Sequence, residues 1–295
     1  MTTTRTSTPG GTWLITPPSD GRLEAALRAE PDVALLDLED SVPPQEKDGA
    51  RTAALAHLGA LGAAPVHGTT VLGLRMNPPG TVHGLKDLLA LAEASLHDTL
   101  LLVPKVESAR DLELVAQVLE ETVTGVRICA LIETPRALLH LGDIVASPVL
   151  AGVVFGAADY AAATGCRRTS RSLWWARSAI AAAAAARGIS SIDSPYFDLG
   201  DPDGLRRDAQ EARDLGFTGK GAVHPAQLPI IRAASRPTEE EVAQARAAVS
   251  AANGADGRPV RVGSQMVGPP LVAAARAVLD RADADIEPAI GGGVR

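Results

Sequence analysis

The chain alternates short apolar runs with longer segments of helical spacing. Eight runs of mainly apolar residues have the length of buried strands, and most are separated by segments with apolar residues three and four positions apart, as in an amphipathic helix. The predicted strands are 13–15, 33–38, 71–74, 99–103, 127–132, 152–155, 189–192 and 217–223, and the predicted helices between them are 21–29, 43–61, 85–94, 109–121, 135–147, 173–187 and 203–215. This alternation predicts a TIM (β/α)8 barrel. An open doubly wound sheet would carry a glycine-rich phosphate turn after its first strand, and none is present in the sequence.

Polar residues follow the predicted strands. In a parallel barrel all strands end at one mouth, so these side chains are expected to converge there. They are Glu39, Asp40, Arg75, Lys105, Glu133, Asp159, Asp193 and His224. One acid at a strand end commonly caps the next helix, but a series at successive strand ends indicates a ligand site.

Glu133 and Asp159 are the candidate metal ligands. They follow neighbouring parallel strands and therefore reach the same rim. Mg²⁺ needs few protein oxygens, because it completes its coordination with water and substrate. The alternative is that both acids cap the helices that follow them.

Composition and charge exclude several classes of protein. The chain has 295 residues, is 46% apolar and has a net charge of −7, and it shows no basic stripe for a nucleic acid or an anionic membrane. The sequence contains no signal peptide or membrane-spanning run, so we expect a cytoplasmic enzyme. Cys129 and Cys166 have no spacing typical of a disulfide framework or a metal site.

Six motifs carry a resemblance to a known family. They are Leu36–Val42 (LDLEDSV), Arg75–Asn77 (RMN), Val103–Ser108 (VPKVES), Leu131–Thr134 (LIET), Phe155–Asp159 (FGAAD) and Gly219–Gln227 (GKGAVHPAQ). In this order they resemble the citrate lyase beta subunit-like family of the HpcH/HpaI aldolase superfamily, which comprises magnesium-dependent carbon–carbon lyases. The likeness extends over residues 13–279.

The resemblance implies roles for particular residues. Glu133 and Asp159 match the family's Mg²⁺ ligands, and Arg75 matches the arginine that holds the substrate carboxylate. Glu39 and Asp40 match an acidic pair that orients this arginine and the metal waters, whereas Asp37 is expected to be structural. Substrate contacts are further expected from Lys105, Gly156 and Ala158.

Alternatives stay open for three groups of residues. Lys105 follows a strand as a Schiff-base lysine can, but two nearby carboxylates would keep it charged, so we interpret it as an electrostatic or structural partner. His224 is either a general base or a residue that shapes the end of its strand. Arg167, Arg168 and Arg171 either meet the phosphates of a coenzyme A ester or lie in a solvated loop.

Three segments are predicted: a flexible N-terminus (1–11), the barrel (12–235) and a C-terminal helical extension (236–295). In the extension, Thr238 and Glu241 form a capping box, residues 254–270 lack periodicity, and 271–282 is a last helix. By analogy with the family, the extension packs on a neighbouring subunit in a homotrimer or a dimer of trimers.

One departure from the family pattern concerns chemistry. Where many relatives have an aspartate proposed as the acid/base for the acetyl-CoA methyl group, this chain has Gly268. We expect a Mg²⁺-dependent carbon–carbon lyase acting on a β-hydroxy or 2-oxo acid, free or as an acyl-CoA ester. A thioester hydrolase on the same scaffold and a non-catalytic ligand-binding protein are the alternatives.

Overall fold

The computed structural model describes residues 8–61, 70–94, 96–120, 122–253 and 258–284. The chain divides into two compact units, residues 1–232 and 233–295.

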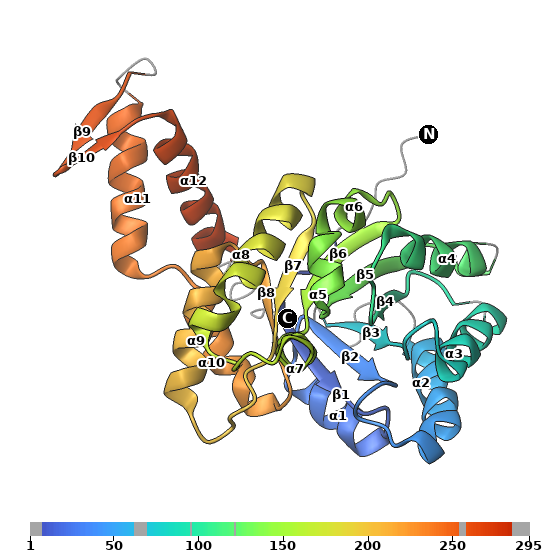
Figure 1. Ribbon diagram of the computed structural model, residues 1–295. Helices are drawn as coiled ribbons and strands as arrows, with labels where there is room; N and C mark the ends of the chain where they lie inside the picture. Colours follow the sequence, from blue (N-terminus) through green and yellow to red (C-terminus); the bar gives the residue numbers. More distant parts are fainter. Residues whose placement is uncertain (1–7, 62–69, 95, 121, 254–257, 285–295) are drawn as a thin grey trace. The chain divides into compact units, whose positions relative to one another are not determined.

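The first unit is a closed barrel of eight parallel strands, each paired with the next and β8 paired with β1 (Figure 1). This confirms the predicted TIM barrel. The strands are β1 (Gly11–Thr16), β2 (Val33–Asp37), β3 (Val71–Arg75), β4 (Leu100–Val103), β5 (Arg127–Ile132), β6 (Leu150–Phe155), β7 (Ser190–Asp193) and β8 (Gly219–Ala222).

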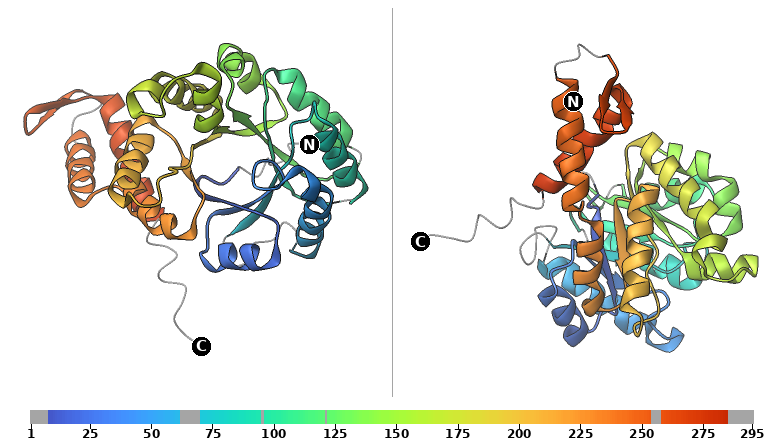
Figure 2. Two further views of the ribbon diagram at one scale, coloured as in Figure 1. Left: turned by 60° about the horizontal axis from the view of Figure 1, so that its bottom comes forward. Right: turned by 90° about the vertical axis from the view of Figure 1, so that its left-hand side faces the viewer.

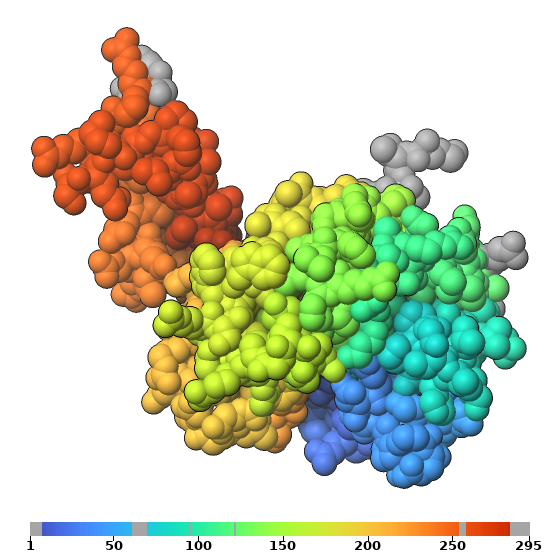
Figure 3. All heavy atoms as spheres, in the orientation of Figure 1, coloured from blue at the N-terminus to red at the C-terminus, as the bar shows by residue number. Residues whose placement is uncertain are grey.

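Helices surround the strands, as the view with the barrel turned forward shows (Figure 2). They are α1 (Asp20–Arg28), α2 (Lys47–Leu61), α3 (Val82–Glu93), α4 (Ala109–Leu119), α5 (Pro135–Leu139), α6 (Leu141–Ala146), α7 (Ala157–Thr164), α8 (Ser170–Arg187), α9 (Pro202–Leu215) and α10 (Leu228–Ser235), with the 3₁₀ turns η1 (Pro44–Glu46) and η2 (Pro225–Gln227). In the space-filling view, α5, α6 and α8 form a continuous green to yellow-green surface of this unit (Figure 3).

Alternation along the strands separates two faces. Side chains such as Leu35, Leu102 and Leu131 point into the barrel and form an interior cluster with Trp13. Neighbours such as Leu36 and Leu101 point outward and pack in the larger core that includes residues of the helices. The face that a strand residue occupies therefore decides whether it can reach the mouth.

Several boundaries differ from the prediction. The segment predicted as one helix (135–147) is two, because His140 leaves the helical conformation and its Nδ1 lies 2.9 Å from the carbonyl oxygen of Glu107. Helix α7 was not predicted, since it is short and its end is marked mainly by Gly165, a left-handed C-cap. Helix α10 was not predicted either.

The barrel begins earlier than predicted. Residues 1–7 of the segment expected to be flexible lie outside the described residues, but Thr8 is buried and its carbonyl accepts a hydrogen bond from Ser190. Gly11 already belongs to β1.

The second unit contains α11 (Glu239–Ala252), β9 (Val260–Val262), β10 (Gln265–Val267) and α12 (Pro269–Ala284), with a small core of alanine and valine. The predicted capping box of Thr238 and Glu241 is confirmed. The expectation of an irregular segment over 254–270 is wrong for its second half: β9 and β10 form an antiparallel hairpin, turning at Gly263 with φ +59°. Three-residue strands are too short to show a pattern, and residues 254–257 lie outside the described residues.

Among the described residues, no helix combines the length and the apolar character needed to cross a membrane.

Candidate functional site

Arg75 is clamped by Asp37 at the mouth of the barrel. The two residues are partners in the register of β2 and β3, and both point inward. Arg75 donates from Nε to Oδ1 of Asp37 at 2.6 Å and from Nη2 to Oδ2 at 2.7 Å. Burial opposes ionisation of Asp37, but the hydrogen bonds and charge of Arg75 outweigh it, so the pKa of Asp37 is lowered. This two-bond pair fixes the guanidinium plane.

Glu39 and Asp40 contact the remaining side of the same guanidinium. Nη1 of Arg75 lies 2.9 Å from Oε2 of Glu39 and 3.3 Å from Oδ2 of Asp40. The Asp37 carboxylate also accepts from the backbone N–H groups of Glu39 and Ser41, which shapes the turn carrying the acidic pair. Burial raises the pKa of Glu39 to about 7 despite the charge of Arg75. The sequence interpretation placed Glu39 and Asp40 as the partners of Arg75; the structure adds Asp37 as the strongest one.

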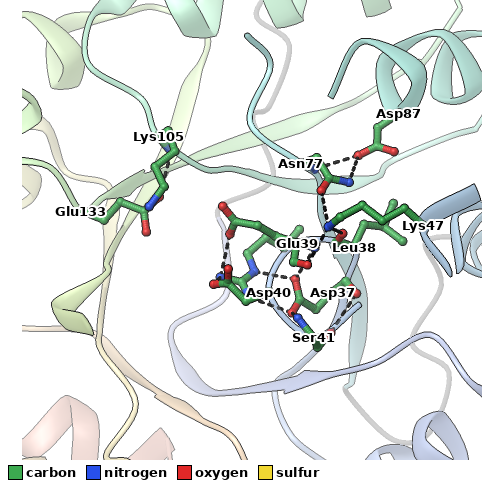
Figure 4. Close-up of polar contacts among 11 residues, drawn as sticks. Asp37, Leu38, Glu39, Asp40, Ser41, Lys47, Asn77, Asp87, Lys105 and Glu133 are labelled. Atoms are coloured by element: carbon green, nitrogen blue, oxygen red, sulfur yellow. Dashed lines mark hydrogen bonds and ion pairs between the residues drawn. The ribbon is translucent and has the colours of Figure 1, made fainter. Parts of the chain in front are cut away.

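A buried lysine supports this turn from behind (Figure 4). The ammonium of Lys47 donates to the carbonyl oxygens of Leu38 and Glu39, both at 2.8 Å, and to Oδ1 of Asn77 at 2.6 Å. Asn77 in turn donates from its backbone and its side chain to Oδ2 of Asp87, both at 2.7 Å. Lys47, Asn77 and Asp87 were not singled out from the sequence, because nothing in their local pattern separates them from ordinary surface residues.

A second group joins β4, β5 and α7. The Lys105 ammonium lies 2.8 Å from Oδ1 of Asp159 and 3.5 Å from Oε1 of Glu133. Its backbone N–H donates to the same Glu133 oxygen at 2.8 Å. Lys105 is therefore a charged partner of both carboxylates, in agreement with the sequence interpretation. Its φ of +54° is unfavourable for a residue with a side chain, at a cost of about 1–3 kcal/mol, and is held by these contacts.

Burial has different effects on the two carboxyl groups. It raises the pKa of Glu133 to about 8, with the charge of Glu39 adding to the shift and Lys105 opposing it. For Asp159 burial also opposes ionisation, but Lys105 outweighs it and the pKa is lowered. Glu133 is 1% exposed and Asp159 is 42% exposed at the side chain, so they form the inner and outer edges of one site.

The pair fits a small hard cation. Oε2 of Glu133 is buried and has no hydrogen-bond partner, so a cation would satisfy it and remove the penalty that raises its pKa. Within the described ranges, no three Asp, Glu, His or Cys side chains form a metal cluster. A cation here would have two protein carboxylates and an otherwise open shell, which suits Mg²⁺.

Gly156 and Ala158 lie beside these carboxylates. A Cβ at position 156 would come within 2.5 Å of Glu133 Cβ and 2.8 Å of its Oε2, so this position requires glycine. The N–H of Gly156 is already bonded to Ile132, so the residue supplies space and not a donor. Ala158 lies in the first turn of α7, whose N–H groups have no partner within the helix.

These groups share one cavity of about 350 Å³, lined by the Arg75 clamp, Glu133, Asp159, Gly156 and Ala158, and by apolar residues of the barrel interior.

The expectation that Asp193 joins this site is wrong. Asp193 lies next to Ile192, which points inward, and therefore faces the helices. It pairs there with Arg177 of α8 and with Lys220 of β8.

His224 follows its structural alternative. It is exposed, and its Nδ1 accepts from the backbone N–H of Ala226, capping η2. Of the loop arginines, Arg168 stacks over the ring of Phe197 at 4.9 Å, while Arg167 and Arg171 are exposed.

The sequence profile of the HpcH/HpaI aldolase/citrate lyase family matches residues 19–225, which include every residue of both groups. The chain belongs to the HpcH/HpaI family. The predicted resemblance is thereby confirmed.

Characterised relatives of this HpcH/HpaI chain carry different activities in their names. It is 35% identical to the citrate lyase subunit beta-like protein of Deinococcus radiodurans, over 85% of this chain and 89% of that one. It is also 35% identical to the (3S)-malyl-CoA thioesterase of Cereibacter sphaeroides, over 78% of each chain. The family therefore holds both lyase-type and thioesterase relatives at equal identity.

Among solved structures, protein CitE of Mycobacterium tuberculosis in complex with magnesium, acetoacetate and coenzyme A has a TM-score of 0.79 to this chain and 31% identity. The match covers 93% of this chain and 98% of that one, so the likeness extends beyond the residues of the profile.

Proposed function

We propose that the protein is a Mg²⁺-dependent carbon–carbon lyase acting on a small 2-oxo or β-hydroxy acid, as the free acid or as an acyl-CoA ester. The observation that supports this best is the buried, unpartnered Oε2 of Glu133, which lines the same cavity as Asp159 and Arg75. A purely structural carboxylate would be paired, because an unsatisfied buried charge is costly.

Glu133 and Asp159 hold the metal in this proposal. When bound, Mg²⁺ supplies Lewis-acid polarisation of the substrate oxygens. Because the Lys105 ammonium contacts both carboxylates, it balances their charge at the edge of the site, where it can also meet the substrate.

Arg75 binds the substrate carboxylate. Four contacts to Asp37, Glu39 and Asp40 hold its guanidinium and leave one of its five N–H donors for a ligand. Glu39 and Asp40 orient Arg75, and Lys47 holds their turn through backbone carbonyls. A preoriented donor loses little freedom on binding, so it recognises the ligand by position.

The purified protein can be screened against 2-oxo acids and acyl-CoA esters by mass spectrometry, with Mg²⁺ and with EDTA. We expect carbonyl products of carbon–carbon cleavage only with Mg²⁺, and none from the Glu133→Gln variant. Release of free coenzyme A without a carbonyl product would replace the lyase by a thioesterase.

The second candidate, a thioesterase, is favoured by Gly268. A positioned acid or base typically contributes about 10² to 10⁴-fold in rate, and glycine has no side chain to offer. We therefore expect weak or absent condensation with acetyl-CoA by this chain, together with retained metal-dependent binding of oxo acids.

The variant Gly268→Asp tests this point. A Cβ at position 268 meets nothing closer than Pro259 Cγ at 3.9 Å, so the substitution is sterically tolerated. It should raise condensation by about tenfold, a part of the full effect of a positioned base. Gly268→Asn is the matched control, with similar size and no base. Efficient malyl-CoA or citryl-CoA cleavage by the unmodified protein would show that another residue serves as the base.

The packing of residues 236–295 on a neighbouring subunit, and with it a homotrimer or dimer of trimers, stays a prediction.

A further inference from the structure

The floor of the cavity is apolar. Below the charged mouth it is formed by inward side chains of the barrel interior, among them Leu35, Leu102, Leu131, Val154 and Ile192. Gly221 of β8 adds no side chain to this wall. A substrate that occupies the cavity therefore places one of its parts against hydrocarbon.

Charge at the cavity is strongly one-sided. Among the described residues that line it, Arg75 is the single cationic side chain, and four acids line it as well: Asp37, Asp40, Glu133 and Asp159. With one N–H of Arg75 left for a ligand, the cavity can recognise one substrate carboxylate. A second carboxylate on the floor would be buried without a partner and next to like charges, which is strongly unfavourable.

The size of the cavity limits the ligand further. About 350 Å³ is at the lower end of the roughly 300–1,000 Å³ found for small-molecule pockets. It suits a short acid and not the nucleotide part of a coenzyme.

We infer that the reacting acid is a 2-oxo monocarboxylate that carries an alkyl substituent beyond the oxo carbon, and not a dicarboxylate. This rests on the proposed function, since it assigns the substrate class of the same site. The carboxylate and oxo group lie at the mouth, against Arg75 and the carboxylate pair. The alkyl group lies against Val154 and Ile192, where each added methylene exchanges water for hydrocarbon.

Calorimetry in the presence of Mg²⁺ tests the inference with a graded series of acids. Affinity should rise by about fourfold per methylene from pyruvate to 2-oxobutanoate and 2-oxopentanoate, the effect of burying one such group. The decisive pair is 2-oxopentanoate against 2-oxopentanedioate, which share a chain length and differ in a methyl against a carboxylate. We expect the dicarboxylate to bind at least about tenfold more weakly.

Two substitutions of Val154 locate the effect. Val154→Ala lengthens the floor and should shift the optimum to longer alkyl chains, whereas Val154→Phe fills it and should reduce binding of 2-oxopentanoate while leaving pyruvate nearly unchanged. Val153→Ala is the matched control, because Val153 is the neighbouring residue in β6 but belongs to the outer core. It should lower the melting temperature and leave the order of preference as it is.

The outcomes separate the two proposals. If pyruvate binds in a Mg²⁺-dependent manner but 2-oxopentanedioate binds as well as 2-oxopentanoate, the inferred class is wrong and the proposed function stands. The same conclusion holds if Val154→Ala and Val153→Ala change the preference equally. If none of the acids binds in a Mg²⁺-dependent manner, both proposals fail.

Discussion

The barrel carries two buried arginine–aspartate pairs of nearly identical geometry on opposite faces of its strands. Arg75 and Asp37 point inward at the mouth, joined at 2.6 and 2.7 Å. Arg177 and Asp193 lie between the strands and the helices, joined at 3.1 and 2.9 Å.

The surroundings of the two pairs differ. Outside, Lys220 donates to Asp193 and to the Ser194 carbonyl oxygen, both at 2.7 Å, and Arg177 Nη1 lies 2.6 Å from Glu211. Inside, the acids exceed the cations, and Oε2 of both Glu39 and Glu133 has no hydrogen-bond partner. The same residue chemistry therefore serves stability where its groups are satisfied, and ligand binding where they are left incomplete.

Removing the acids should separate the two faces most strongly. Glu133→Ala or Asp159→Ala should weaken Mg²⁺ binding by more than about 100-fold, since loss of a mere supporting residue already costs 10–100-fold. Asp193→Ala should leave Mg²⁺ affinity unchanged but lower the free energy of unfolding by about 3–5 kcal/mol, because it leaves two buried cations with one partner fewer. Mg²⁺ calorimetry and denaturant unfolding measure both. Undiminished Mg²⁺ binding by the first two variants would contradict the metal site.

Replacing each arginine by lysine tests the two-bond geometry. Arg75→Lys should weaken oxo-acid binding by about 1.5–3 kcal/mol, which is roughly 10- to 150-fold, because lysine cannot hold the planar fork. Arg177→Lys should lower the melting temperature and leave the affinity unchanged. Equal affinities of Arg75→Lys and the unmodified protein, measured by calorimetry, would remove Arg75 from the binding site.

Proton competition should distinguish the inner face as well. The pKa of Glu133, about 8, exceeds its ordinary value of 4.5, so the metal-free folded protein holds a proton that Mg²⁺ must displace. Mg²⁺ affinity should rise by about tenfold per pH unit up to about pH 8 and then level off.

The same shift sets the stability of the metal-free protein. A folded pKa above the unfolded one contributes stability that is complete below about pH 4.5 and is lost as the pH rises through about 8. Glu39, with a pKa of about 7, acts in the same direction. Glu133→Gln should therefore flatten the decline of stability with pH. An unchanged slope in this variant would mean that Glu133 is ionised without metal.

The smallest expected effect comes from the supporting lysines. Lys47→Met should reduce oxo-acid affinity by about tenfold, because Lys47 fixes the turn of Glu39 through backbone carbonyls. Lys220→Met removes a lysine that is buried to a similar degree and should affect only stability. Calorimetry paired with thermal unfolding compares the two. Parallel losses of affinity in both variants would show that Lys47 has no specific role at the mouth.

The sequence by itself determined the barrel and the order of its parts. Eight strands separated by amphipathic helices have few other ways to bury their apolar faces, and strand direction places every strand end at one mouth. For that reason Glu133, Asp159, Lys105 and Arg75 could be assigned to one region before any coordinates were known.

Only the tertiary structure decided which strand-end residues meet. A shift of one residue reverses the face of a side chain, so Asp193 turned outward to Arg177 while Asp37, expected to be structural, became the main partner of Arg75. The support from Lys47 and Asn77 joins residues that are distant in the chain, and the short β9–β10 hairpin depends on contacts within its own unit. Periodicity records the average face of a segment, whereas pairing and burial are set by neighbours that only folding brings together.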